Sequence, residues 1–113
     1  MSEELIKTKY EIFGEKIRGI SQKEQEVLLW KTLEALQGKV FYTAKGLEFS
    51  YVIRGGELFV DRKNKSITSA TVNMAFHRAR ELNGDVCGPK MLGTFGASYL
   101  YPVFIEIGVI RRK

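Results

Sequence analysis

Residues 61–84 read DRKNKSITSATVNMAFHRARELNG, a stretch in which a basic turn runs into a helical pattern. The turn is Arg62-Lys63-Asn64-Lys65, and the polar segment Ser66-Ile67-Thr68-Ser69 follows it. Apolar residues then recur at the spacing of one face of an α-helix, at about 100° per residue. The stretch therefore predicts an amphipathic helix that begins at the polar segment and ends at Leu82-Asn83-Gly84.

This predicted helix has two chemically different faces. The apolar face, which we expect to pack in the core, consists of Val72, Ala75, Phe76, Ala79 and Leu82. The opposite face carries three side chains that can donate hydrogen bonds, Asn73, His77 and Arg80. These three either read a partner or meet water, and the acidic Glu81 on the same side argues against a close approach to phosphate.

The length and composition favour one soluble domain. A chain of 113 residues with 44% hydrophobic content builds a single modest core, so we expect one domain over residues 1–113. The start of the chain is acidic, and the longest apolar run, residues 99–110, contains Pro102 and Glu106. A membrane span needs roughly 20 apolar residues, so we expect no membrane segment. The single cysteine, Cys87, fits a reducing compartment, and we expect a cytoplasmic protein.

The net charge lies entirely in the second half of the chain. Residues 61–113 contain nine basic and four acidic residues, which accounts for the whole formal charge of +5. Residues 1–60 are balanced, with nine of each sign. Such asymmetry favours a polyanionic partner, although a basic solvated surface explains it too.

The first 38 residues predict helices. Residues 2–20 suggest a helix or an arm with helical turns, because Gly14 interrupts their apolar face. We expect residues 1–20 to form a mobile arm of the domain. Ser21 and Glu24 form a capping box, in which each side chain accepts from a backbone N–H at the start of a helix. We expect that helix to end at Gly38 and to present Leu29, Leu33 and Leu36 to the core.

Three short strands are predicted next, at residues 39–44, 47–54 and 57–60. Lys45-Gly46 and Gly55-Gly56 join them, and the second pair is typical of a tight hairpin because glycine accepts positive φ angles. The middle strand alternates an apolar face with a mostly polar one. The apolar residues are Leu47, Phe49, Tyr51 and Ile53.

The last third of the chain predicts two helices. Residues 90–94 suggest a short helical turn, and Ser98 is a candidate cap for a helix that ends at Gly108. The i, i+3, i+4, i+7 spacing of Leu100, Val103, Phe104 and Ile107 favours a helix. Pro102 and the alternation of branched residues also leave a strand open over residues 99–110.

Together these elements predict an α+β fold. It has N-terminal helices, a three-stranded antiparallel sheet, and two C-terminal helices in one layer against that sheet. The apolar face of the sheet should pack on Leu29, Leu33 and Leu36 and on Val72, Phe76 and Ala79.

We expect a small basic regulatory protein that binds nucleic acid, preferably duplex DNA, without being an enzyme. Arg62, Lys63 and Lys65 would contact phosphates ahead of a helix N-terminus, where the helix dipole already favours an anion. Asn73, His77 and Arg80 would face the groove. Arg111, Arg112 and Lys113 would add salt-dependent affinity.

Two alternatives remain open from the sequence. The first is an adaptor or inhibitor that covers an acidic protein surface with its aromatic C-terminal segment, and exposed Tyr99 or Tyr101 would suggest a homodimer. The second is a metal-dependent nuclease that uses Glu48, Asp61 and Lys63. Because the chain has one histidine and one cysteine, we expect no His/Cys metal site, and no cofactor motif is evident.

Overall fold

The computed structural model of the protein describes residues 21–62 and 64–111. The helix or arm expected over residues 2–20 lies outside this part, as do Lys63, Arg112 and Lys113. The described chain is α+β, as predicted. Its elements in chain order are α3 (Gln22–Ala35), β1 (Phe41–Tyr42), β2 (Glu48–Phe49), β3 (Tyr51–Arg54), β4 (Glu57–Val60), β5 (Ile67–Thr68), α4 (Ser69–Glu81), the 3₁₀ helix η1 (Pro89–Leu92) and α5 (Ala97–Glu106).

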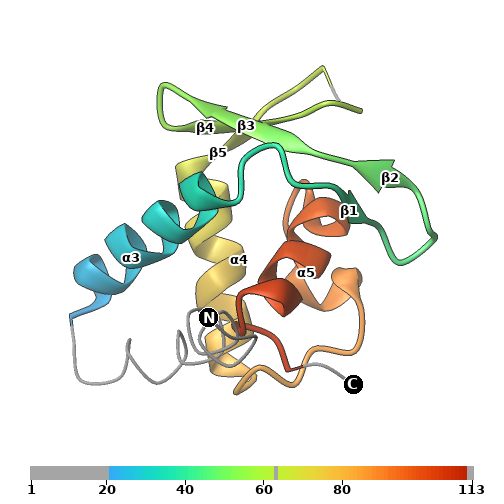
Figure 1. The fold of residues 1–113 in the computed structure, drawn as a ribbon. Coiled ribbons are helices and arrows are strands. Elements are labelled where there is room, and N and C mark those ends of the chain that lie inside the picture. The colour runs from blue at the N-terminus through green and yellow to red at the C-terminus, as the bar shows by residue number, and fades with distance from the viewer. Residues whose placement is uncertain (1–20, 63, 112–113) are drawn as a thin grey trace, which may run out of the picture.

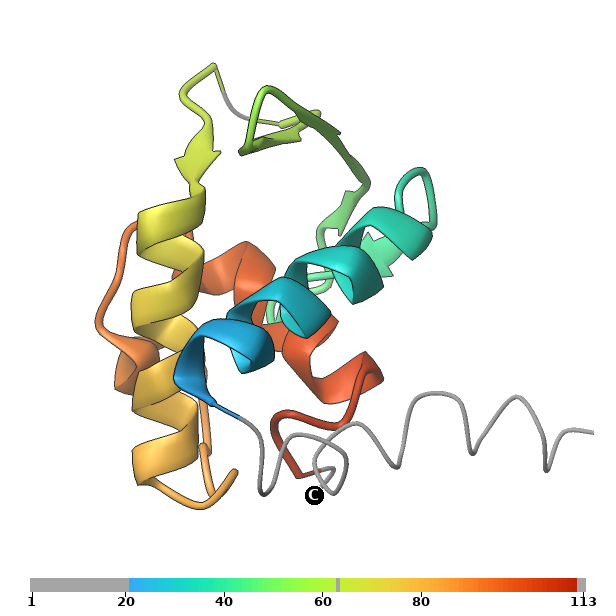
Figure 2. The ribbon, with the colours of Figure 1, turned by 90° about the vertical axis from the view of Figure 1, so that its left-hand side faces the viewer.

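The helices and the sheets form two separate groups of elements (Figure 1). The strands cross one end of the molecule, and α3, α4 and α5 lie beneath them. Figure 2 shows α3 crossing in front of α4 and α5. Helix α5 packs against α4, η1 and β1, so the C-terminal third closes the core from one side. No helix in the described ranges is long and apolar enough to cross a membrane.

The capping box predicted at the start of α3 is confirmed. The Ser21 hydroxyl accepts from the Glu24 N–H at 3.2 Å and donates to the Glu24 carboxylate at 3.1 Å. The helix ends just before Leu36, and Gly38 adopts a φ of +81°, as expected of a residue that stops a helix. Leu29, Leu33 and Leu36 are all buried.

The strands were predicted in the right places, but they form two sheets. The segment 47–54 is divided at Ser50, so that β2 pairs with β1 and β3 pairs with β4. The third strand of the larger sheet is β5, which lies where the polar start of the helix was expected. Ile67 is 2% exposed and pairs with Leu58, so the burial of this one apolar residue makes the segment a strand.

The hairpin between β3 and β4 follows the prediction. Gly55 and Gly56 both have positive φ angles, +57° and +76°, which a tight primed turn requires. Phe49 and Tyr51 point into the core, and the Tyr51 hydroxyl donates to the carbonyl oxygen of Leu33 on α3 at 2.6 Å. The expectation for Leu47 was wrong, because it lies in the turn before β2 and is 47% exposed.

The apolar face predicted for the helix in 61–84 is buried as expected. Val72, Ala75, Phe76 and Ala79 are each 0% exposed. Thr68 caps this helix, α4, by accepting from the Thr71 N–H at 3.2 Å.

Residues 97–106 are a helix, which excludes the strand that the alternation left open. The cap is Gly96, with a φ of +76°, and not Ser98 as the sequence suggested. Ile67 explains the choice, because a Cβ atom at Gly96 would come within 2.4 Å of its Cδ1 atom. Pro102 lies inside the helix, and four buried side chains hold the helix around it, namely Tyr99, Leu100, Val103 and Phe104.

Candidate nucleic-acid interface

The polar face of α4 is turned toward α3. The Nε2 atom of His77 lies 2.7 Å from a carboxylate oxygen of Glu26, and the two side chains are 30% and 29% exposed. Asn73 and Arg80 are partly buried on the same helix. The histidine ring therefore has a partner within the fold. This face of α4 is less exposed than the face of a helix that enters a nucleic-acid groove.

The predicted phosphate contacts are spread over both ends of α4. Arg62 and Lys65 are exposed in the loop between β4 and β5, close to the start of the helix. Arg111 is exposed near its end, where its backbone N–H donates to the carbonyl oxygen of Gly84 at 2.9 Å. A helix of 13 residues is about 20 Å long, so Arg111 and Arg80 do not join the loop in one patch.

Lys65 instead lies beside the turn that precedes α5. Its Nζ atom is 4.8 Å from the centre of the Phe95 ring, within the range of a cation–π contact. Phe95 is 41% exposed and stands between Thr94 and Gly96. The basic loop is therefore joined in space to a segment that follows it by about thirty residues in the sequence.

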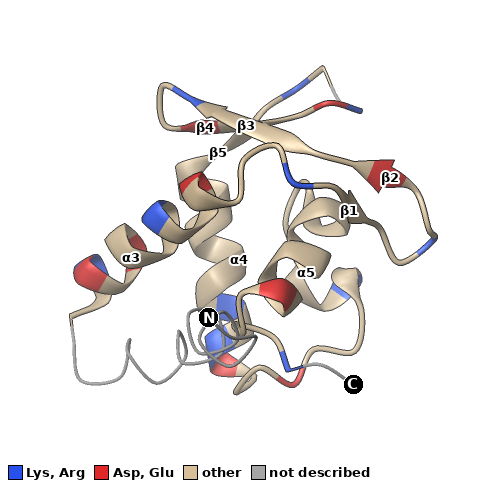
Figure 3. Ribbon diagram, viewed as in Figure 1, with Lys and Arg blue, Asp and Glu red and all other residues tan. Residues whose placement is uncertain are grey.

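A hollow of about 400 Å³ opens on this turn, and we call it the lysine hollow. Lys45 reaches it from the turn between β1 and β2, and Lys90 from η1. No acidic residue is among the described residues that line it, which also include Pro89, Gly93, Thr94, Gly96, Ala97 and Ser98. Figure 3 shows how widely the other basic and acidic residues are scattered over the ribbon. The fold thus brings two lysines to a hollow without acidic residues in its described lining, and Lys65 contacts Phe95, which lies between the lining residues Thr94 and Gly96.

The backbone of the hollow also favours a negative charge. Gly96 caps α5 without a side-chain hydrogen bond, so the positive end of the helix dipole faces the turn. The Oγ1 atom of Thr94 is buried and has no hydrogen-bond partner within the described part of the chain. The lysines and the helix dipole together make this surface complementary to phosphate.

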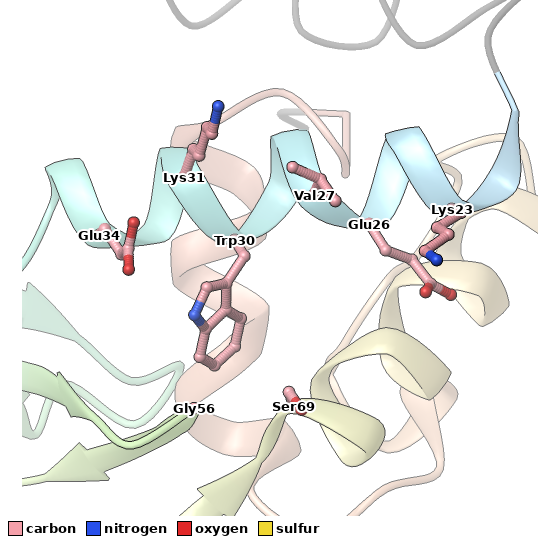
Figure 4. A pocket seen from close by; sticks show the side chains of 8 residues that line it. All are labelled: Lys23, Glu26, Val27, Trp30, Lys31, Glu34, Gly56 and Ser69. Carbon is pink, nitrogen blue, oxygen red and sulfur yellow. The ribbon is translucent and has the colours of Figure 1, made fainter.

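A larger hollow, of about 450 Å³, lies between α3, the β3–β4 turn and the start of α4 (Figure 4). The Trp30 ring projects from α3 toward the space between Gly56 and Ser69. The charged residues that line this larger hollow are two lysines and two glutamates, namely Lys23, Lys31, Glu26 and Glu34. Since these charges cancel, the hollow has no preference for a polyanion.

Of the two acidic residues of the nuclease alternative, Asp61 has a structural partner. The Asp61 carboxylate accepts from the backbone N–H of Ser50 at 3.2 Å. Glu48 is exposed on β2, and Lys63 lies outside the described residues. Within residues 21–62 and 64–111, no group of three or more His, Cys, Asp and Glu side chains is placed to hold a metal ion.

The aromatic residues of the C-terminal segment belong largely to the core. Tyr99 is 9% exposed and meets Phe49 edge to face at 5.0 Å between ring centres. Tyr101 is partly buried and donates to the carbonyl oxygen of Val86 at 3.5 Å. The exposure that would have suggested a homodimer through Tyr99 is therefore not found.

Lys45 and Lys90 were missed by sequence reasoning. Each stands beside a turn residue, Gly46 and Pro89, and such lysines ordinarily meet only solvent. Their convergence depends on the packing of α5 against β1 and η1, which no local pattern reveals.

Comparisons of the chain with known protein families, with curated proteins and with solved structures find no match in any of the three.

Proposed function

We propose that this protein is a small, non-enzymatic regulatory protein that binds nucleic acid through phosphate contacts at the lysine hollow. The observation that carries the proposal is that Lys45 and Lys90, from two separate segments, line one hollow that has no acidic residue among its described lining residues. Lys65 contacts the Phe95 ring in the turn on which this hollow opens.

Phosphate is the anion that this arrangement fits best. Lysine ammonium groups neutralise successive phosphates and release their counterions, which gives affinity without a need for a particular sequence. The N-terminal end of α5 adds the positive end of the helix dipole at the same place. Because His77 is already held by Glu26, the proposal does not depend on base reading by α4.

A salt titration with matched charge variants tests the proposal. The test variant replaces Lys45, Lys65 and Lys90 by glutamine. The control replaces Lys23, Lys31 and Lys39, which removes the same charge from other parts of the surface. Affinities for duplex and single-stranded DNA are measured by fluorescence anisotropy over a range of salt concentrations.

Each lost phosphate contact lowers the slope of log K against log salt by about 0.9 on a duplex and about 0.7 on a single strand. If all three lysines contact phosphates, we expect the slope of the test variant to fall by about 2.7 on the duplex and about 2.1 on the single strand. The slope of the control should stay within about half a unit of that of the original chain. Equal changes in both variants would show that only the net charge matters. The proposal fails if the original chain does not bind, or if its binding does not depend on salt.

A further inference from the structure

One side of α3 carries an exposed stripe of side chains, which we call the α3 stripe. Its members follow one another at intervals of four, three and four residues, and they are Lys23, Val27, Trp30 and Glu34. At about 100° per residue these positions share one side of the helix, and the same intervals occur along the seam between two paired helices. Figure 4 shows Val27 and Trp30 in the middle of the helix, with Lys23 toward one end and Glu34 toward the other.

The α3 stripe is open to solvent and has one unpaired charge at each end. Val27 is 49% exposed, and no ion pair within the described ranges involves Lys23 or Glu34, both of which are exposed. Across the hollow, a Cβ atom added to Gly56 would meet nothing within 4 Å, so the rim does not close over the helix. The stripe thus has an apolar centre between a cation and an anion.

This order of side chains is complementary to itself when two copies of α3 lie antiparallel. A two-fold axis between positions 28 and 29, the midpoint of α3, places position 23 opposite position 34 and position 27 opposite position 30. Lys23 of each copy then faces Glu34 of the other, which gives one ion pair at each end. Val27 of each copy faces Trp30 of the other between them. A parallel pair would instead place like charges opposite one another.

We propose that two copies of this protein associate through their α3 stripes as an antiparallel, two-fold symmetric helix pair. The charges select a second copy over a polyanion, because the stripe has one charge of each sign in the order that its own reversed copy complements. A contact made by one side of a helix is at the low end of interface sizes, so the dissociation constant should be on the order of 10–100 µM. Nucleic-acid titrations well below this range compare monomers, so loss of Lys23 in their control variant does not alter the assembly.

Sedimentation equilibrium of the full chain at physiological salt measures the association. We expect a monomer–dimer equilibrium in this concentration range, and a monomer at every concentration would overturn the inference. Lys23→Glu and Glu34→Lys each place like charges opposite one another at both ends of the pair, so each should weaken the dimer at least about fivefold. Lys90→Glu is the control, because it changes the net charge as Lys23→Glu does but lies on η1, and it should stay within about twofold.

The reciprocal exchange of charges tests the antiparallel arrangement. Lys23→Glu combined with Glu34→Lys in one chain restores opposite charges at both ends, and an equimolar mixture of the two single variants restores them between different chains. We expect both to associate within about threefold of the original chain. A double variant that is folded by circular dichroism but associates as weakly as the single variants would overturn the inference. Single variants that associate as tightly as the original chain would place the contact elsewhere and overturn it too.

The fluorescence of Trp30 gives a second readout, because this residue is the only tryptophan of the chain. Its ring loses water when the pair forms, so we expect the emission to move to shorter wavelengths as the dimer forms. Val27→Ser, at an exposed position, should remove both the shift and the dimer without unfolding the chain. An emission that stays constant while the dimer forms would overturn the inference. So would an emission change from Val27→Ser in a chain that is always monomeric, which would assign the stripe to a contact within one chain.

Discussion

The Nε2 atom of His77 on α4 lies 2.7 Å from the Glu26 carboxylate on α3, and the contact joins positions 51 residues apart. The contact joins two helices, and the sequence pattern of neither helix predicts that they meet. It also turns the polar face of α4 toward the interior of the helical layer.

The coupling between these two side chains can be measured by a double-mutant cycle. We expect Glu26→Gln and His77→Gln to be coupled by about 0.5–1 kcal/mol in the free energy of unfolding, because both groups are partly buried. Urea denaturation of the four proteins gives the value. The exposed pair Arg78–Glu81, 3.6 Å apart, is the control and should show no coupling beyond about 0.3 kcal/mol. Equal coupling in the two pairs would contradict this explanation.

Nucleic-acid affinity should be insensitive to the same histidine. If phosphates are bound at the lysine hollow, His77→Gln should change the affinity for DNA by less than about twofold. Lys90→Gln should cause an affinity loss at low salt that is several times larger than that of His77→Gln. Anisotropy titrations of both variants make the comparison. A larger loss of affinity from His77→Gln than from Lys90→Gln would indicate that α4 contacts the bases.

The position of Gly96 against Ile67 should make that glycine hard to replace. A Cβ atom there would lie 2.4 Å from the Ile67 Cδ1 atom, and the residue has a φ of +76°. We expect Gly96→Ala to lower the free energy of unfolding by about 2–4 kcal/mol, from backbone strain together with overpacking. Gly93→Ala is the control, since Gly93 also has a positive φ but a Cβ atom added there would meet nothing within 4 Å. This substitution should lower the free energy of unfolding by about 1 kcal/mol.

Removing the Cδ1 methyl group of Ile67 separates the overpacking from the backbone strain. In the Ile67→Val background the Cδ1 atom is absent, so Gly96→Ala should be less damaging by about 1 kcal/mol. Additive effects of the two substitutions in thermal or urea unfolding would show that the contact with the Cδ1 atom is not the cause.

Local signals predicted most of the fold. The Ser21 capping box, the Gly55-Gly56 turn and the apolar face of α4 depend on residues within one element, and each is found where the pattern indicates it. Ile67 and Gly96 show what such signals miss. Their mutual packing makes a strand of one segment and moves the start of α5, and no pattern within either segment contains that information.

The candidate site was predictable to a smaller extent for the same reason. Lys65 is exposed in the turn where the sequence places it, but Lys45 and Lys90, which line the hollow, are distant from it along the chain. His77 has a helical spacing that suits an exposed face, and only the crossing of α3 over α4 supplies its partner Glu26.

The buried hydrogen bond of Tyr51 should stabilise the junction of the sheet with α3. Its hydroxyl donates to the Leu33 carbonyl oxygen at 2.6 Å, and the residue is 1% exposed. Tyr51→Phe leaves that oxygen without this donor, so we expect the free energy of unfolding to fall by about 1–2 kcal/mol. Tyr42→Phe, at an exposed position, should change it by less than about 0.5 kcal/mol in the same denaturation experiment. Similar losses in both variants would argue against the bond.

The hydroxyl of Thr94 presents the opposite case. Its Oγ1 atom is buried without a hydrogen-bond partner among the described residues, so the group is desolvated with no compensating contact. Valine has the same shape without the oxygen, and we therefore expect Thr94→Val to leave the free energy of unfolding unchanged or to raise it by up to about 1 kcal/mol. Thr32→Val is the matched control, because the Thr32 hydroxyl donates to the Leu28 carbonyl oxygen at 2.8 Å, and it should lower the value by about 0.5–1 kcal/mol. A loss of stability in Thr94→Val as large as that in Thr32→Val would show that the Thr94 hydroxyl has a partner in the folded protein.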